Sequence, residues 1–272
     1  MHDVTIATEI GTLPMKFFLG THEPSWLRTA GVPLFVSARR LRRLKKAPRA
    51  ACEWALDSGG FTELSMHGRW MLPAREYAAE VDRWSDEVGR MAWAAPQDWM
   101  CEPKIRTKTG LSVAEHQART VGSVVELRGL VRSAHVIPVV QGWELRDYVR
   151  CVRLYEDAGI DLLAEPVVGV GTVCRRQSVA EGQEIISTLA DLGLQLHGFG
   201  LKTLGLQAVG GCLASADSLA WSYTAWRQKI RLPGCTHETC ANCMRWALDW
   251  RAGVVDRPMG RPAQLGLWPV AS

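Results

Sequence analysis

Three aspartates in this sequence each follow a short apolar run, and their placement suggests acid–base chemistry. Asp57 is followed at once by a hydroxyl and two glycines in the stretch DSGGF, Asp98 lies in PQDW, and Asp217 lies in SADS. A single aspartate at such a point is often only a helix cap or a turn residue. Three that converge on one site would instead suit glycosidic chemistry, in which two carboxylates share the nucleophilic and the acid/base roles.

The apolar runs recur at a steady interval and alternate with helix-like segments. The eight expected strands are Met15–Leu19, Val32–Val36, Trp54–Leu56, Arg90–Ala95, Ala134–Val140, Asp161–Ala164 with Val167–Val168, Leu194–Phe199 and Gly211–Ala216. They are short and show little period-two alternation, which is typical of parallel strands buried on both faces. Eight such units predict an α/β fold, the (β/α)8 TIM barrel. A doubly wound open sheet is the alternative, but no GxGxxG or GxxxxGK stretch follows the first strand.

The segments between these strands are expected to be mostly helical. Helices are predicted over residues 37–49, 73–89, 145–158, 178–192, 201–210 and 219–230, and a hairpin that turns at Gly68 is predicted over 63–72. A further long helix is expected to begin after Ser112, with Glu115 at the capping-box position.

A barrel carries its chemistry at the carboxyl ends of its strands. The predicted strand ends bring together His22, Asp57, Asp98, Gln141, the loop Gly169–Gly171, Lys202 and Asp217. The third carboxylate and the glutamine have the donors and acceptors needed to read the edge of a base.

Several motifs occur together in a fixed order: DSGGF at 57–61, PQDW at 96–99, VVQG at 139–142, LHGFG at 196–200, SADS at 215–218 and a cysteine cluster at 235–243. On these motifs the chain resembles the tRNA-guanine transglycosylase superfamily, most closely its smaller members, the deazapurine DNA modification protein A group of phages and bacterial genomic islands. The resemblance implies an enzyme that exchanges guanine in a polynucleotide for a 7-deazaguanine such as preQ0. It favours DNA over tRNA, and it implies a cytoplasmic location in a bacterial or phage-infected cell.

The resemblance also implies roles for individual residues. Asp217 matches the nucleophile that attacks C1′ and forms a covalent intermediate, and Asp57 matches the acid/base residue. The implied base-binding residues are Asp98 and Gln141 at the base edge, Phe61 stacked on one face, His197 on the other face, and Ser58 and Gly169 beside them.

The stretch CTHETCANC predicts a metal site. Its ligands would be Cys235, His237, Cys240 and Cys243, and three thiolates with one imidazole make a closed tetrahedral set for structural zinc. The family usually takes its histidine from far downstream, but no histidine follows His237 here. A redox pair in the CxxC is the alternative, although that motif normally opens a helix after a strand.

The other cysteines share no spacing and are expected to be free thiols: Cys52, Cys101, Cys151, Cys174 and Cys212. The expected division of the chain is a catalytic barrel over residues 1–230 and a zinc-binding segment over 231–272 packed against it.

The net charge of +4 and the pI of about 8.7 are compatible with nucleic-acid binding without requiring it. The strongest charge run contains Arg39, Arg40, Arg42, Arg43, Lys45, Lys46 and Arg49. Such a run is either a solvated helix face or a surface for phosphates. Trp26, Trp99 and Trp143 are candidates for stacking on bases.

No transmembrane helix or secretory signal is expected, because the chain has neither a long apolar run nor a basic region followed by an apolar core at its start. Three alternatives to the DNA enzyme stay open: a tRNA-guanine transglycosylase acting on RNA, a barrel glycoside hydrolase acting on a small nucleoside or glycoside, and a zinc-stapled nucleic-acid-binding module without turnover.

Overall fold

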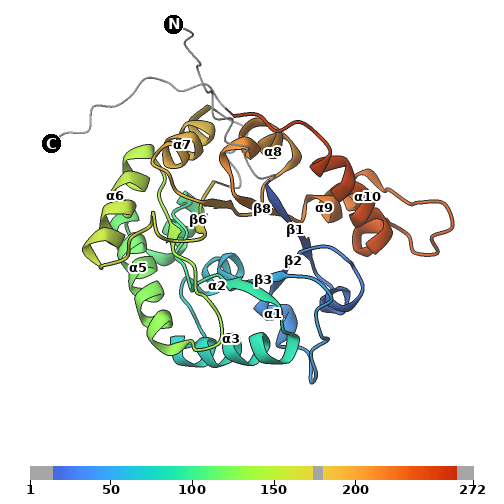
Figure 1. Cartoon of the computed structure of the whole chain (residues 1–272), viewed down its shortest axis with the longest axis horizontal. Coiled ribbons are helices and arrows are strands. Elements are labelled where there is room, and N and C mark those ends of the chain that lie inside the picture. The colour runs from blue at the N-terminus through green and yellow to red at the C-terminus, as the bar shows by residue number, and fades with distance from the viewer. Residues whose placement is uncertain (1–14, 174–179, 262–272) are drawn as a thin grey trace, which may run out of the picture.

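The computed structural model of the chain describes residues 15–173 and 180–261, and its centre is a ring of eight parallel strands (Figure 1). The strands are β1 Lys16–Thr21, β2 Leu34–Ser37, β3 Trp54–Asp57, β4 Met91–Ala94, β5 Val139–Val140, β6 Val168–Val170, β7 Leu196–Gly198 and β8 Ser215–Ser218. Their order in the sheet is β4-β3-β2-β1-β8-β7-β6-β5, so the first and last strands are neighbours.

The ring closes between β4 and the segment that leads into β5. Ala94 N–H donates to the carbonyl of His135 at 2.9 Å, and Ile137 N–H donates to the carbonyl of Ala94 at 3.1 Å. These two hydrogen bonds form a single parallel bridge, Ala94 with Val136. The predicted (β/α)8 barrel is therefore confirmed.

Most of the helices surround the ring on its outer side, whereas α2 (Gly60–His67) lies across the inside of the ring in this view (Figure 1). The helices are α1 Ala38–Leu41, α2 Gly60–His67, α3 Ala74–Val88, α4 Pro103–Thr109, α5 Val113–Leu130, α6 Leu145–Asp157, α7 Ala180–Asp191, α8 Thr203–Val209, α9 Ala220–Gln228 and α10 Met244–Val255, with short 3-10 turns η1 Pro24–Arg28, η2 Gly210–Cys212 and η3 Cys240–Asn242. The predicted capping box of α5 is present: Glu115 N–H donates to the Ser112 hydroxyl at 3.2 Å, and Ser112 N–H donates to the Glu115 carboxylate at 2.8 Å.

Two local predictions are wrong. Residues 63–72 do not form a hairpin, because α2 runs to His67 and ends at Gly68, whose φ of 67° is the left-handed conformation of a helix cap. The basic segment 37–49 is helical only over α1. Its buried positions Leu41, Ala47 and Ala50 are spaced six and nine residues apart and cannot share one face of a helix, so the chain bends to bury them.

Some boundaries also differ from the prediction. β6 begins at Val168 and excludes 161–164, and β8 begins at Ser215 after the 3-10 turn η2. Asp217 consequently lies within β8 rather than beyond its end. The predicted helix 178–192 corresponds to α7, and its first two residues lie outside the described part of the chain.

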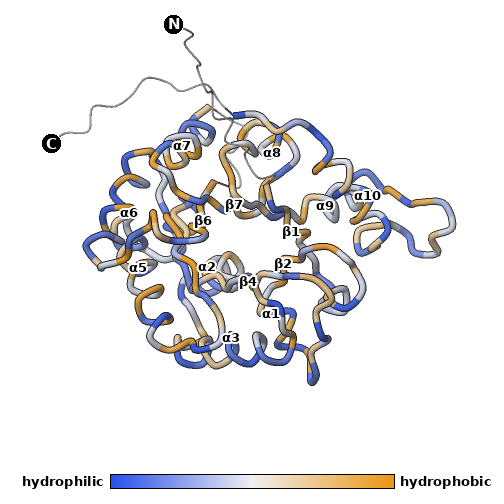
Figure 2. The backbone as a smooth tube through the Cα atoms, viewed as in Figure 1, coloured by the Kyte–Doolittle hydropathy of each residue, from blue (hydrophilic) through white to orange (hydrophobic). Residues whose placement is uncertain are grey.

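The barrel interior is packed with side chains and is not a channel. Phe18, Ala55, Trp93, Ala95 and Ile137 form its buried cluster, and the rings of Phe35 and Phe199 pack against it. Two larger clusters lie between the strands and the surrounding helices, and Figure 2 shows the hydrophobic residues along the ring with hydrophilic residues toward the outer rim. This rigid core fixes the positions of the strand ends.

The scattered cysteines are free thiols in the described ranges. Cys101, Cys151 and Cys212 are buried and Cys52 is half-buried, while Cys174 lies outside the described residues. Burial raises the pKa of Cys151 to about 12, so this thiol stays protonated at neutral pH. Among the helices that the structure describes, none is long and apolar enough to cross a membrane.

Candidate active site

A cavity of about 510 Å³ opens at the carboxyl ends of the strands. Its lining includes Asp57, Ser58, Phe61, Asp98, Asp217, Arg39, Arg40 and Arg43, which come from β3, β8, α1, α2 and the loops beside them. A cavity of this size suits a small organic group such as a nucleobase. The barrel therefore brings together the three aspartates that the sequence places far apart.

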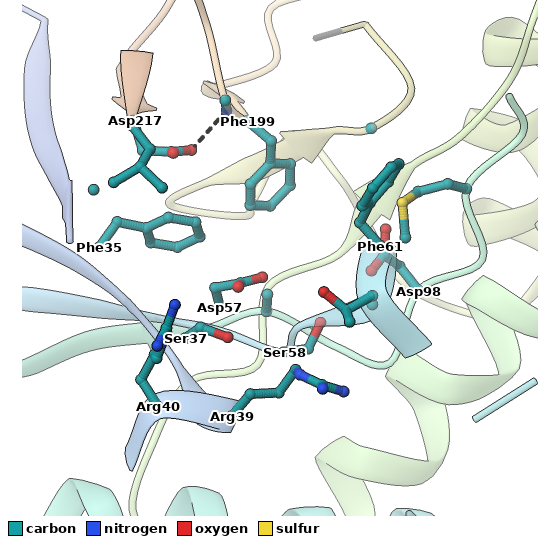
Figure 3. Close-up of a pocket in the computed structure, with 18 of the residues that line it drawn as sticks. Phe35, Ser37, Arg39, Arg40, Asp57, Ser58, Phe61, Asp98, Phe199 and Asp217 are labelled. Carbon is teal, nitrogen blue, oxygen red and sulfur yellow. Dashed lines mark hydrogen bonds between the residues drawn. The ribbon is translucent and has the colours of Figure 1, made fainter. Parts of the chain in front are cut away.

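Asp217 is held from two sides at the floor of this cavity. Its Oδ1 accepts a hydrogen bond from Gly200 N–H at 2.9 Å, drawn as the dashed line in Figure 3. The same oxygen accepts from His197 Nε2 at 3.3 Å. Because a carboxylate only accepts, the His197 proton lies on Nε2, and Nδ1 meets the Ser215 hydroxyl at 2.9 Å. These bonds fix the carboxylate through Oδ1, while no residue of the described chain donates a hydrogen bond to its Oδ2.

His197 lies beneath Asp217 rather than against a base. Its side chain is fully buried, and its ring packs 4.7 Å from the ring centroids of both Trp93 and Phe199. Within the described residues, His197 does not border the cavity. The histidine of the LHGFG stretch thus lies in the barrel core and contacts the Asp217 carboxylate, and its expected position on the face of a base stays a prediction.

Asp57 borders the same cavity at the end of β3, and Figure 3 shows it on the other side of the Phe35 ring from Asp217. Burial raises the pKa of Asp57, and the Asp217 carboxylate adds to this rise, while hydrogen bonds from Gly59 N–H and Ser37 oppose it. The Gly59 bond measures 3.0 Å. A raised pKa favours the protonated form of this carboxyl group, as suits a general acid.

Gly59 of the DSGGF stretch has to be glycine for two reasons. Its φ is 82°, a conformation that side chains rarely adopt. A Cβ atom there would also lie 2.7 Å from Cδ of Arg39. The stretch thus combines the acid with the tight turn that presents it.

Asp98 is half-buried on the wall beside Phe61 (Figure 3). Burial, together with the Asp57 and Glu102 carboxylates, raises the pKa of Asp98 to about 7 against the opposing hydrogen bond from Gln141. At neutral pH Asp98 therefore exists in both states, so it can donate a hydrogen bond as well as accept one.

Gln141 holds Asp98 in place. Its Nε2 donates to Asp98 Oδ2, and its Oε1 accepts from the Thr172 hydroxyl at 2.7 Å. The side chain is fully buried, and in the described structure it does not border the cavity. In this structure Gln141 therefore contacts Asp98, and its expected contact with a base edge stays a prediction.

Thr172 is a site residue that the sequence did not reveal. Its φ is 63°, which is rare for a β-branched residue and points to a conformation held by its surroundings. The hydroxyl accepts from Cys101 N–H at 2.8 Å while it donates to Gln141. No motif marks this position, because the strain is visible only in the backbone.

The glycine-rich loop contributes other residues than expected. Gly169 N–H donates to the carbonyl of Pro138 at 2.8 Å, and a Cβ atom on Gly169 would lie 2.5 Å from the Phe199 ring. Gly169 is therefore part of the barrel packing. Gly171 and Thr172 border the cavity, and a side chain on Gly171 would overlap the Gln141 carboxamide.

Aromatic rings form the apolar part of the wall. Phe61 is 42% exposed at the rim, and Phe35 and Phe199 also line the cavity, whereas Ser58 is buried. Only Phe61 was expected to have this role from the sequence. Flat apolar walls with a few carboxyl groups suit a planar, polar-edged ligand.

The basic residues of 37–49 are divided between the rim and the outer surface. Arg39 pairs with Glu63 at 2.6 Å, and Arg40 Nη2 donates to His22 Nδ1 at 3.3 Å. Burial, with help from Arg40, lowers the pKa of His22, which keeps this imidazole a neutral acceptor. Arg43 is exposed and borders the cavity.

The remaining cations of this run lie away from the cavity that the described residues form. Arg42 pairs with Glu80 at 2.7 Å, and Lys45, Lys46 and Arg49 are exposed. Lys202, which was expected at the mouth, does not border this cavity either. Only part of the predicted phosphate surface is thus near the candidate chemistry.

Two of the tryptophans that were candidates for base stacking are core residues. Trp26 and Trp99 are 6% and 9% exposed, and Trp26 stacks on Trp221 at 5.5 Å. Trp143 is half-buried. The exposed large aromatics of the described chain outside the cavity are Tyr223 and Trp226, both on α9.

The Cys/His cluster converges as the sequence predicted. Ligand atoms of Cys235, His237, Cys240 and Cys243 all lie within 4.8 Å of one another. The sulfur of Cys235 is 4.0 Å from that of Cys243 and 3.8 Å from that of Cys240. Tetrahedral bonds of about 2.3 Å to one ion place two sulfur atoms about 3.8 Å apart, so the residues fit a metal ion.

Groups next to the cluster also suit thiolate ligands. Leu232 N–H donates to the Cys240 sulfur at 3.3 Å, and an Arg245 nitrogen lies 3.4 Å from the Cys235 sulfur. A redox pair would need only Cys240 and Cys243, whereas here four residues meet. The convergence of all four favours a metal site.

A family model described as DpdA, DeoxyPurine in DNA protein A, matches residues 13–268. A search of curated proteins found no match to the chain. The matched range contains the three aspartates, Thr172 and all four residues of the Cys/His cluster. The chain belongs to the DpdA family, DeoxyPurine in DNA protein A.

Proposed function

We propose that the protein is a DNA-modifying transglycosylase that exchanges a guanine base in DNA for a 7-deazaguanine such as preQ0. The observation that carries the proposal is the presence of Asp57 and Asp217 in one cavity in different environments. Burial raises the pKa of Asp57, whereas Asp217 is oriented by Gly200 N–H and His197. The family name supports DNA as the polymer.

The first half of the reaction replaces the base by the enzyme. The target nucleotide has to leave the base stack to reach the cavity. An oxygen of Asp217 forms a bond to C1′ while the bond from C1′ to N9 breaks, and the electron pair leaves with guanine. Asp57 gives its proton to the departing guanine, which leaves a covalent ester between the deoxyribose and Asp217.

The second half reverses these roles. Guanine leaves and a 7-deazaguanine enters the same cavity. The Asp57 carboxylate takes the N9 proton of the incoming base, whose nitrogen attacks C1′ and releases Asp217. Both carboxyl groups return to their starting states, so the exchange needs no net proton and no external energy source.

The base itself would lie among Phe61, Phe35 and Asp98. The aromatic rings provide flat apolar contacts, and Asp98, with its pKa raised to about 7, offers either a donor or an acceptor to the base edge. Gln141 and Thr172 keep Asp98 in position. These contacts support a purine-like ligand over a sugar chain.

We propose zinc as the ion of the Cys/His cluster. Cys235, His237, Cys240 and Cys243 would hold it, and with four protein ligands it would supply a structural link and no catalysis. The division into a barrel over 1–230 and a zinc-binding segment over 231–272 stays a prediction. A protein acting on cellular or phage DNA would work in the cytoplasm.

The test is a base-exchange assay with a DNA oligonucleotide in which one guanine carries an isotope label. We expect wild type to release labelled guanine and to incorporate preQ0, as measured by mass spectrometry of the nucleosides. Asp217→Asn should release none, whereas Asp86→Asn, an exposed aspartate on α3, should match wild type. Equal release by Asp217→Asn would overturn the proposed nucleophile, and exchange in tRNA alone would replace DNA by RNA as substrate.

A further inference from the structure

Helix α9 leads away from the cavity and has two very different sides. It begins directly after Leu219, which lines the cavity. Its inner side carries Trp221 and Ala225, which are 1% and 0% exposed, and Trp221 Nε1 donates to the carbonyl of Gly20 at 2.8 Å. The helix is therefore anchored firmly against the barrel.

The other side of α9 exposes a pair of aromatic rings. Tyr223 and Trp226 are 56% and 57% exposed, and their ring centroids lie 6.0 Å apart with an angle of 38° between the planes. Residues three apart on a helix are neighbours, so the two rings form one surface. Large aromatic rings exposed together are unusual on a protein that has no partner for them.

Cations surround this pair. Arg227 donates to the Tyr223 hydroxyl at 3.3 Å, and the Lys229 ammonium lies 5.8 Å from the centre of the Trp226 ring. Arg231 follows and is exposed. No aspartate or glutamate occurs between residues 219 and 234, so this part of the surface offers positive charge and aromatic faces without a nearby acid in the sequence.

The Cys/His cluster fixes the far end of this surface. Cys240 N–H donates to the carbonyl of Ile230 at 2.7 Å, and Ile230 and Leu232 pack against Cys240 and Cys243. Trp246 on α10 donates from its indole nitrogen to the carbonyl of Trp221 at 3.0 Å. Figure 1 shows α9, α10 and the loop between them together at one edge of the barrel.

We propose that Tyr223 and Trp226, with Arg227, Lys229 and Arg231, form a stacking platform for the DNA strand that flanks the target nucleotide. The proposal rests on the proposed function in taking DNA as the polymer. Aromatic rings beside a positive backbone track are the features that bind single strands without sequence preference. Seven residues of helix separate Leu219 from Trp226, a rise of about 10 Å, which corresponds to about three base steps.

This geometry predicts a dependence on strand length. A strand of about three nucleotides occupies the cavity alone, whereas one of about twelve also reaches the platform. Binding of the long strand should therefore depend on the two rings, and binding of the short one should not.

The test measures the affinity of dye-labelled single-stranded DNA of both lengths by fluorescence anisotropy. We expect Trp226→Ala and Tyr223→Ala each to weaken binding of the long strand about tenfold and to leave that of the short strand within twofold. Trp226→Phe should restore most of the affinity, because a smaller ring still stacks. Leu163→Ala, which removes another side chain with 62% exposure, should behave as wild type.

The outcomes separate this proposal from the proposed function. Weaker long-strand binding in the alanine variants supports the platform even if no base exchange is observed. Wild-type affinity in both alanine variants overturns it even if exchange proceeds, as does a wild type that binds neither strand. If the variants retain affinity but change from dimer to monomer in sedimentation, the rings cover a second copy of the chain and the platform is likewise overturned.

Discussion

The four residues of the Cys/His cluster all lie between positions 235 and 243, whereas the three aspartates of the cavity come from positions 57, 98 and 217. The cluster is built within one short segment of the chain. The cavity needs the whole barrel, because the strands bring its residues together only when the ring is complete. Damage to the cluster should therefore affect local structure, and damage to the cavity should affect chemistry while the fold survives.

The largest effect is expected from loss of the metal. Cys240→Ala removes a ligand, and binding of a structural zinc ion by such a set contributes about 10 kcal/mol or more to the local fold. We expect metal content to fall from one ion per chain to none, measured by elemental analysis, and proteolysis to begin within residues 231–250. Buried Cys151→Ala serves as the control that keeps its metal. An intact metal content in Cys240→Ala would contradict the assignment of the cluster.

The next effect concerns the acid of the cavity. Asp57→Asn cannot protonate the departing guanine, so base exchange should fall by about 10²–10⁴-fold. The binding of DNA and the circular dichroism spectrum should remain those of wild type, because the carboxamide has almost the same shape. If Asp57→Asn lost its folded spectrum together with its activity, Asp57 would be needed for the fold as well as for the chemistry.

A smaller effect is expected from Thr172, which supports the cavity and should contribute modestly to the stability of the fold. Thr172→Val removes the hydroxyl between Cys101 N–H and the Gln141 carboxamide and leaves two buried polar groups without that partner. The cost should be about 1–3 kcal/mol in urea unfolding. Thr172→Ser keeps the hydroxyl and should recover most of the stability and the exchange rate. Equal stability of the valine and serine variants would exclude the hydroxyl as the cause.

The last prediction concerns the pH dependence of stability. The pKa of Asp98 is about 7 in the folded protein, well above the usual value of 3.8, so between these values the folded state binds more protons than the unfolded state. Wild type should therefore lose stability as pH rises through this window. Asp98→Asn should remove this contribution, as measured by thermal unfolding at several pH values. An unchanged slope would show that Asp98 titrates normally.

The sequence predicted different parts of the molecule for different physical reasons. The buried parallel strands and the convergence of the four Cys and His residues of CTHETCANC follow from local composition and spacing, and both were found as expected. The α2 segment was mistaken for a hairpin because Gly68 in the left-handed conformation suits a hairpin turn and a helix cap equally well. Such an ambiguity is resolved only by packing.

The sequence predicted the carboxylates of the cavity but not the roles of the residues that hold them in place. Asp57, Asp98 and Asp217 follow strand patterns, whereas the roles of Gln141 and His197 depend on whether each side chain faces the cavity or the interior. A shift of one residue in strand register reverses that direction. Phe35 and Phe199 were missed for the same reason, because the sequence does not show whether an aromatic side chain near a strand end faces the cavity or the surrounding helices.

The closure of the ring has a consequence for motion. Only one bridge joins β4 to the segment before β5, and above it the Asp98–Gln141–Thr172 hydrogen bonds connect the loops that follow β4, β5 and β6. A ligand that draws Asp98 away from Gln141 would loosen the barrel at this seam. Amide hydrogens of Ala94 and Ile137 should then exchange with solvent faster when the cavity is filled, whereas those between β1 and β8 keep their protection.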